Sequence, residues 1–195
     1  MRGDDDTMSD SLRGMYLVAS KRLRDSNFYK TVVLIIEDGS EGSMGLVVNR
    51  PSSVTVAHAL SEHFHLPETD DQVYVGGPVE PSALFILHSA ADLETEDALV
   101  LPGVYVGSSA DAFERIVRAA SDGDPELRFR IFSGCAGWAP GQLAGELERG
   151  DWIYLPATVE SLFDSDPYEL WNTTRNRYND LHSILPSGPA NPEWN

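Results

Sequence analysis

The chain has 195 residues, of which 42% are apolar, so it is long enough to fold as one domain that buries roughly 70% of its unfolded surface without a disulfide or a metal. Its formal net charge is −17, from 31 acidic and 14 basic residues, which disfavours direct nucleic-acid binding because such binding depends on neutralising phosphates. Cys135 is the only cysteine, so an internal disulfide is excluded.

No targeting or membrane segment is expected from the sequence. The start of the chain, residues 1–11, is acidic and polar and predicts a disordered leader, without the positive start and apolar stretch of a secretory signal. No apolar run approaches the roughly 20 residues that a membrane span needs. The sequence therefore predicts a cytoplasmic location and no association with membranes.

Strand patterns recur along the chain. A continuous β-branched run over 31–36 is typical of a strand buried on both faces, and turn residues over 38–43 join it to a second buried strand over 45–49 as a hairpin. Arg50-Pro51 is expected to end this second strand, because proline cannot donate to the ladder. Further strands are predicted over 16–19, 73–75, 84–87, 104–106, 127–132 and 152–155.

Helices are predicted from the residues that cap or punctuate them. The expected starts are Thr55 for a helix to about Phe64, Ser108 or Ser109 for 110–120, Pro140 for a short helix that Gly150 ends, Thr158 for one turn, and Asp166-Pro167 for a final helix with Leu170 and Trp171. About eight strands interleaved with short helices, and no interior linker, predict a single domain of the α/β class in its mixed α+β form.

The segment 133–147 (Ser-Gly-Cys-Ala-Gly-Trp-Ala-Pro-Gly-Gln-Leu-Ala-Gly-Glu-Leu) concentrates unusual residues in a predicted turn-to-helix transition. Its glycines permit a tight backbone path that Trp138 can cover, and the N–H groups at the start of the helix can receive a carboxylate or phosphate. Gln142 and Glu146 lie four residues apart and so share one helix face. The alternative interpretation is structural, with glycines for close packing and Trp138 as part of the core.

Two further segments are candidates for a ligand site. Asn49 and Arg50 follow a buried strand, where Arg50 can clamp an anion that Asn49 orients; alternatively Arg50 pairs with Glu146 or Asp151 inside the fold. Gly76-Gly77-Pro78 offers only backbone, which suits either a close approach to a ligand or neighbouring strand, or a turn that ends a strand.

Catalytic and metal signals are weak. Cys135 has His88 as its only plausible base, and a small buried hydrophobic residue is the favoured interpretation. The spacing of His58, His63 and His65 does not suit metal binding on a helix, so no metal site is predicted. The basic residues over 21–24 and at Arg175 and Arg177 are interpreted as solvated faces.

Taken together, motifs in order along the chain resemble the YqgE/AlgH family of bacterial proteins over roughly residues 12–171, leaving residues 1–11 and a C-terminal extension, 172–195, outside the resemblance. The motifs are Leu-Val-Ala-Ser at 17–20, Asp-Ser-Asn-Phe at 25–28, Thr-Val-Val-Leu at 31–34, Glu-Gly-Ser-Met-Gly-Leu-Val-Val-Asn-Arg-Pro at 41–51, Gly-Gly-Pro-Val at 76–79, Leu-His at 87–88, the segment 134–147 and Gly-Asp-Trp at 150–152. The resemblance implies a compact domain with a bifurcated, partly barrel-like mixed sheet. It implies no activity and no cofactor, although a transcription-regulator label accompanies the family.

We therefore expect a non-enzymatic binding or regulatory domain that uses no cofactor and recognises a small anion or a protein partner. The expected surface consists of Asn49, Arg50, Gly77, Pro78, Trp138, Gln142 and Glu146. The first alternative is an enzyme in which Arg50 holds an anionic substrate and Glu146 or Asp151 acts as the base. The second alternative, a regulator that binds DNA directly, requires a basic stripe.

Overall fold

In the computed structural model, which describes residues 11–61, 71–91 and 98–182, the apolar runs form the strands of one sheet. The strands are β1 (Met15–Ala19), β2 (Val32–Gly39), β3 (Gly42–Val47), β4 (Pro51–Thr55), β5 (Gln72–Val75), β6 (Val79–His88), β7 (Ala98–Leu101), β8 (Val104–Gly107), β9 (Phe129–Trp138) and β10 (Trp152–Pro156). The helices are α1 (Val56–Ala59), α2 (Ala110–Ser121), α3 (Gln142–Glu148), α4 (Val159–Phe163) and α5 (Leu170–His182).

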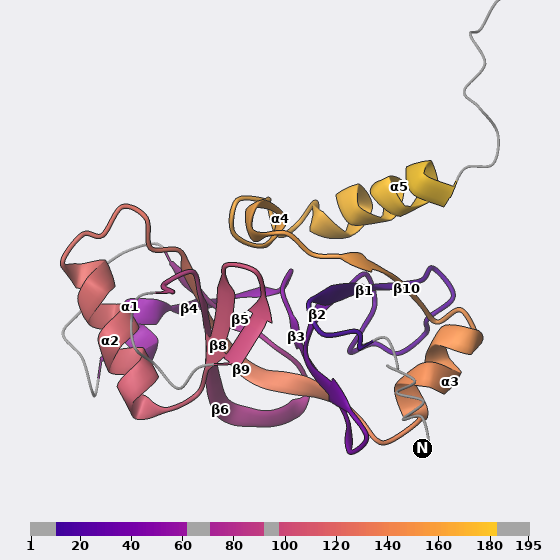
Figure 1. Cartoon of the computed structure of the whole chain (residues 1–195), viewed down its shortest axis with the longest axis horizontal. Coiled ribbons are helices and arrows are strands. Elements are labelled where there is room, and N and C mark those ends of the chain that lie inside the picture. Colours follow the sequence, from indigo (N-terminus) through magenta and orange to yellow (C-terminus); the bar gives the residue numbers. More distant parts are fainter. Residues whose placement is uncertain (1–10, 62–70, 92–97, 183–195) are drawn as a thin grey trace, which may run out of the picture.

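The sheet runs in the order β10-β1-β2-β3-β9-β6-β8-β7, with neighbouring strands antiparallel. It forks at β9: β5 pairs in parallel with the first part of β9, β3 pairs with its last part, and β4 extends the fork beyond β5. The prediction of a single mixed α+β domain with a bifurcated sheet is confirmed, and the sheet does not close into a barrel. Figure 1 shows α1 and α2 at one end of the sheet, α3 at the other, and α4 and α5 along one side.

The fork depends on glycine, because the chain leaving β5 passes directly over the backbone of β9. A Cβ atom on Gly76 would lie 2.2 Å from the carbonyl oxygen of Gly134. Gly76 also donates its N–H to Ser133 and accepts the N–H of Val47, so it joins β3 and β9. The close approach predicted for this segment is therefore to a neighbouring strand.

The core has apolar layers on both faces of the sheet. In β2, Leu34 points into one layer and Val33 and Ile35 point into the other, which confirms a strand buried on both faces. The first layer is covered by α4 and α5 and the second by α3. A third cluster holds the apolar faces of α1 and α2 against β5, β6 and β9.

Three of the predicted helix starts are confirmed, whereas the final helix, α5, begins at Leu170 and not at Asp166-Pro167. Thr55, Ser109 and Thr158 each accept a backbone N–H in the first turn of α1, α2 and α4, and Thr158 forms a full capping box with Ser161. The helix α1 is shorter than expected: it ends at Ala59 and not near Phe64. Residues 62–70, including the expected end of this helix, lie outside the described residues.

The prediction was wrong around the segment 133–147. The strand β9 continues to Trp138 instead of turning, because β3 and β6 both pair with it there and outweigh the turn tendency of its glycines. Pro140 is not the first helical residue, since Gly141 adopts a left-handed conformation (φ 75°) and α3 begins only after it. Gly150 (φ 72°) does follow the helix end, as expected.

Two strands were not predicted. The strand before Arg50-Pro51 does end, at Val47, but Pro51 then begins β4, because the first residue of an edge strand needs no N–H in the ladder. The other is β7, which follows residues 92–97 outside the described part of the chain. Residues 1–10 of the predicted leader, His63, His65 and the tail beyond 182 also lie outside it. Within the described residues, every helix is too short or too polar to span a bilayer.

Candidate functional site

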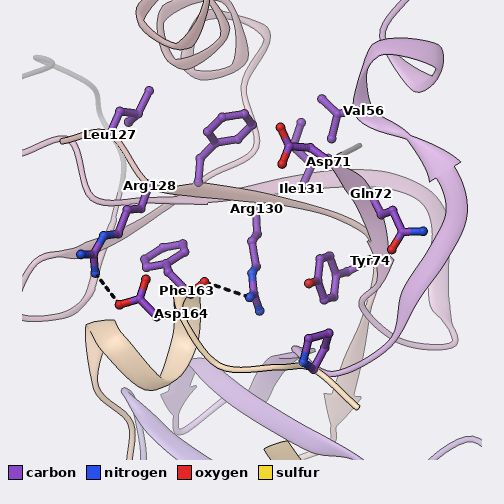
Figure 2. A pocket seen from close by; sticks show the side chains of 12 residues that line it. Val56, Asp71, Gln72, Tyr74, Leu127, Arg128, Arg130, Ile131, Phe163 and Asp164 are labelled. Atoms are coloured by element: carbon purple, nitrogen blue, oxygen red, sulfur yellow. Dashed lines mark hydrogen bonds and ion pairs between the residues drawn. The ribbon is translucent and has the colours of Figure 1, made fainter. Parts of the chain in front are cut away.

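A cleft of about 530 Å³ lies between β9, β5 and the end of α4 (Figure 2). Arg130 is the second residue of β9, and Arg128 directly precedes that strand, so their side chains, two residues apart in extended chain, point to the same side. In Figure 2 both guanidinium groups point into the cleft, beside Phe163 and Asp164. The lining residues are Val56, Asp71, Gln72, Tyr74, Leu127, Arg128, Phe129, Arg130, Ile131, Phe163, Asp164 and Pro167.

Arg130 is held in place from two sides. Its guanidinium lies 4.8 Å from the ring centroid of Tyr74, and its Nη2 donates to the carbonyl oxygen of Phe163 at 3.2 Å, with a longer contact of 3.5 Å from Nη1 to Val48. Burial lowers the pKa of Arg130, although Tyr74, Tyr16 and Asp164 oppose that shift. Arginine remains a cation under such conditions and has five N–H donors, so donors remain for an oxygen ligand.

Arg128 is the more exposed of the two arginines. Its Nη1 lies 3.1 Å from Oδ2 of Asp164, the residue that ends α4. The two side chains are 44% and 52% exposed, so this ion pair stands at the mouth of the cleft in contact with solvent. The side chain of Arg130 is therefore held in one position, whereas the more exposed side chain of Arg128 can change its position.

Tyr74 forms a polar and aromatic wall of the cleft. Its ring is 8% exposed and packs on Phe132, with ring centroids 5.5 Å apart. Burial raises the pKa of Tyr74 against the opposing effect of Arg130, so the phenol stays neutral and can donate its proton in a hydrogen bond. Asp71 and Gln72 precede it on the same side of the cleft (Figure 2).

Sequence reasoning missed this cleft. The sequence predicts only a strand over 127–132, a stretch in which apolar and basic residues alternate as in a half-exposed strand. That alternation is the signal that puts two guanidiniums on one face. Their partners come from distant parts of the chain, since Asp164 lies 36 residues beyond Arg128.

Three of the predicted site residues do come together, around one carboxylate. Oε2 of Glu146 accepts the indole N–H groups of Trp138 at 2.9 Å and Trp152 at 2.8 Å, and Oε1 accepts Nε2 of Gln142 at 3.0 Å. Partial burial raises the pKa of Glu146, but the hydrogen bonds from Trp152, Gln142 and Trp138, with nearby Arg149, outweigh it and hold the pKa below its usual value.

Asn49 and Arg50 lie in a different environment. Asn49 accepts the N–H of Val32 at 2.8 Å and donates to the carbonyl oxygen of Lys30 at 2.9 Å. Arg50 donates to the carbonyl oxygens of Asn27 at 2.5 Å and Tyr29 at 3.2 Å. Both residues therefore hold the loop between β1 and β2.

The alternative interpretation, in which Arg50 pairs with Glu146 or Asp151, is wrong, since Arg50 donates to backbone carbonyls. Asp151 instead forms an ion pair with Arg149, whose Nη2 lies 2.9 Å from Oδ2, and Glu146 is bonded as described above. The connection between the two regions is aromatic. Phe28, in the loop that Arg50 holds, packs 6.2 Å from the ring centroid of Trp138 and 5.5 Å from that of Trp152.

Gly77 and Pro78 complete the predicted set at a third place. A Cβ atom on Gly77 would lie 2.2 Å from the carbonyl carbon and oxygen of Cys135, so this residue lies against β9, whereas Pro78 is exposed. The seven residues thus form an indole–carboxylate cluster, a loop anchor and a strand crossing. That any of them binds a ligand stays a prediction.

The thiol of Cys135 is buried, and burial raises its pKa, with Glu80 and Glu37 acting in the same direction. A nucleophilic cysteine needs the opposite shift. Cys135 pairs with Val79 at one end of the β6–β9 ladder, whereas His88 is at the other end and stacks on Tyr105 with centroids 5.6 Å apart. Among the described residues, no group of three or more His, Cys, Asp or Glu side chains could hold a metal ion.

Comparison with known families gives a match over almost the whole described chain. The AlgH-like family model, DUF179, matches residues 16–180 and so includes most of α5, beyond the range of the recognised motifs. A UPF0301 protein of Myxococcus xanthus is 38% identical over 161 residues, covering 81% of this chain and 86% of that protein. A UPF0301 protein of Chlorobium chlorochromatii is 35% identical over 183 residues, covering 93% and 94%.

Solved structures show the same architecture. The solution structure of the AlgH protein from Pseudomonas aeruginosa is similar with a TM-score of 0.70 and 31% identity, covering 95% of this chain and 99% of that one. The crystal structure of protein DIP2367 from Corynebacterium diphtheriae gives a TM-score of 0.70 and 26% identity, covering 84% and 85%. The motifs, the family match and these relatives agree, and the chain belongs to the bacterial YqgE/AlgH family, also called UPF0301.

Proposed function

We propose that this protein is a non-enzymatic binding domain of the bacterial cytoplasm that takes a small oxyanion, a carboxylate or a phosphate group, into the cleft at Arg130. The observation that carries the proposal is the orientation of Arg128 and Arg130 into one cleft, with Arg130 partly desolvated and stacked on Tyr74. A desolvated guanidinium binds an oxyanion more strongly than an exposed one, because water competes less.

The cleft also suits a ligand with an apolar part. Leu127, Phe129 and Phe163 line it beside the arginines, while Gln72 and Asp71 provide polar groups on the β5 side. Small-molecule sites commonly combine an apolar lining with a few placed polar groups. The supported ligand class is therefore a small organic anion.

Binding is favoured over catalysis because the residues of the enzyme alternative are already engaged. Glu146 accepts three N–H groups and its lowered pKa makes it a weak base at neutral pH, and Asp151 pairs with Arg149. Arg50 donates to backbone carbonyls. The DNA-binding alternative gains no support from the cleft, where Asp71 and Asp164 interrupt the basic side chains.

A thermal-shift screen of the full chain against small carboxylates and phosphates tests the proposal. A ligand is expected to stabilise the wild type in a dose-dependent way, by about 2.7 kcal/mol at a hundredfold excess over its dissociation constant. Arg128→Gln and Arg130→Lys should each weaken that ligand at least tenfold, by an expected loss of about 1.4 kcal/mol.

The matched control is Arg118→Gln, which removes an exposed arginine that pairs with Glu114 on α2 and does not line the cleft. It should bind as the wild type does. A ligand that stabilises all variants equally would place binding elsewhere, and a screen without any stabilising anion would contradict the proposal.

A further inference from the structure

Within the cleft, one anion is already bound to an arginine. The carboxylate of Asp164 lies 3.1 Å from Arg128, inside the same cleft toward which Arg130 points (Figure 2). A carboxylate on a guanidinium is the chemistry that the proposed ligand would use. Asp164 is therefore an internal competitor for that ligand.

The two arginines differ in how firmly their partners are held. Arg130 is bonded to the backbone carbonyl oxygens of Val48 and Phe163 and stacked on Tyr74, and the two hydrogen bonds cannot break without a shift of the backbone after β3 or at the end of α4. The contact between Arg128 and Asp164 joins two side chains that are 44% and 52% exposed. Exposed ion pairs shift an equilibrium by at most about fivefold, so a ligand can replace this one at small cost.

Asp164 also stands at a structural junction. It is the C-cap of α4, and the connection from Asp164 to Glu169 leads to α5. The helices themselves are anchored in the core, with Leu162 at 0% and Leu170 at 2% exposure, while Tyr168 in the connection is 72% exposed. Release of Asp164 would loosen the connection and leave both helices in place.

We infer that an oxyanion enters the cleft by displacing the Asp164 carboxylate from Arg128, so that ligand binding frees the α4–α5 connection. This inference rests on the proposed function, because it assigns a gate to the same site. The exchange is one anion for another on the same guanidinium, and no covalent step is involved. The connection thereby reports whether the cleft is occupied.

The test is an NMR titration of the full chain with benzoate, and in parallel with inorganic phosphate, in the wild type, Asp164→Asn and Asp166→Asn. Asp166 is the matched control: it also acts electrostatically on Tyr74, its Oδ1 accepts the N–H of Tyr168, and asparagine keeps that acceptor. Both substitutions remove one negative charge near the cleft. Only Asp164→Asn removes the competing carboxylate, so it should lower the dissociation constant of the anion about fivefold. With Asp166→Asn the dissociation constant should stay within about twofold of the wild-type value.

Hydrogen exchange supplies the second measurement. In the wild type, saturation with the anion should speed exchange at amides between Asp164 and Leu170. Equal tightening by the two substitutions would overturn the displacement, since it would show a general charge effect. The displacement would also be overturned if Arg128→Gln abolished binding and Asp164→Asn left the affinity unchanged. The proposed function would survive that result. An absence of binding in the wild type and in Asp164→Asn would overturn the proposed function itself.

Discussion

At the scale of single residues, Glu146 shows how a polar side chain can be essential to packing. The indole N–H groups of Trp138 and Trp152 are held in an apolar environment where an unpaired donor costs free energy. One carboxylate oxygen accepts both of them, and the other accepts Gln142. The charge on Glu146 therefore stabilises the fold.

Replacing Glu146 by glutamine should destabilise the protein by about 1–3 kcal/mol at pH 7, because the new amide cannot accept all three N–H groups. The pKa of Glu146 is lowered in the folded state, so its stabilisation is present above about pH 4.5 and is lost as the pH falls through the lowered pKa. Urea unfolding at pH 7 and pH 3 should thus show a difference in the free energy of unfolding between wild type and variant that is smaller at the lower pH. Glu148→Gln, an exposed position on the same helix, is the control and should change little at either pH.

A second prediction at this scale concerns Arg50. Its guanidinium holds two carbonyl oxygens of the loop that carries Phe28. Arg50→Ala should therefore lower the free energy of unfolding by about 1–3 kcal/mol and alter tryptophan fluorescence, because Phe28 packs on Trp138 and Trp152. Arg22→Ala, at an exposed position, should do neither. If the two variants were equally stable, the loop would not depend on these hydrogen bonds.

At the scale of elements, β9 organises the molecule. It pairs with β3, β5 and β6. Arg130 of the cleft lies at its start, with Arg128 just before it, and Trp138 of the indole–carboxylate cluster lies at its end. The fork is possible only where the chain after β5 can lie directly on the backbone of β9. Glycine provides that space at Gly76 and Gly77, where a Cβ atom would meet backbone atoms.

Gly77→Ala tests the fork. The added methyl carbon would lie 2.2 Å from the carbonyl of Cys135, a contact with backbone that cannot move aside cheaply. We expect a loss of about 3 kcal/mol in the free energy of unfolding, measured in urea. The control is Gly39→Ala, since nothing lies within 4 Å of a Cβ atom there. Similar stabilities of the two variants would show that the strand crossing can relax.

At the scale of the whole molecule, Tyr16 connects the sheet to the helices on one side. Its side chain is 1% exposed, and its hydroxyl lies 3.2 Å from Oγ of Ser161 on α4. Burial raises the pKa of Tyr16 to about 12, against smaller opposing effects of Ser161, Arg130 and Arg177. The phenol is therefore kept neutral in the folded protein at a pH where the unfolded chain would ionise.

This predicts a loss of stability in alkali. Because the folded pKa is raised, the stabilisation is complete below about pH 10 and is lost as the pH rises toward 12, to the extent of about 2 kcal/mol. Urea unfolding between pH 9 and pH 12 should show this decline in the wild type and less of it in Tyr16→Phe. Tyr154→Phe, at a residue that is 49% exposed, should decline as the wild type does. An equal decline in Tyr16→Phe would assign the alkaline loss to other groups.

Features that depend on neighbouring residues could be predicted from the sequence. The caps at Thr55, Ser109 and Thr158 and the β2–β3 hairpin follow from local chemistry, and the burial of β2 on both faces follows from its continuous β-branched run. The motifs identified the family for the same reason, since each is a short run with a fixed spacing. The forked sheet was predicted only through that resemblance.

Which of these residues come into contact depends on the packing of the whole fold. Glycines of the segment 133–147 suggested a turn, but pairing with β3 and β6 drew the chain into a strand. Glu146 and Asp151 were possible partners of Arg50, but in the fold Arg50 donates to backbone carbonyl oxygens. Arg128 and Asp164 form one wall of the cleft although 36 residues separate them. Such contacts depend on how strands and helices pack in three dimensions, and no local preference of the chain encodes that arrangement.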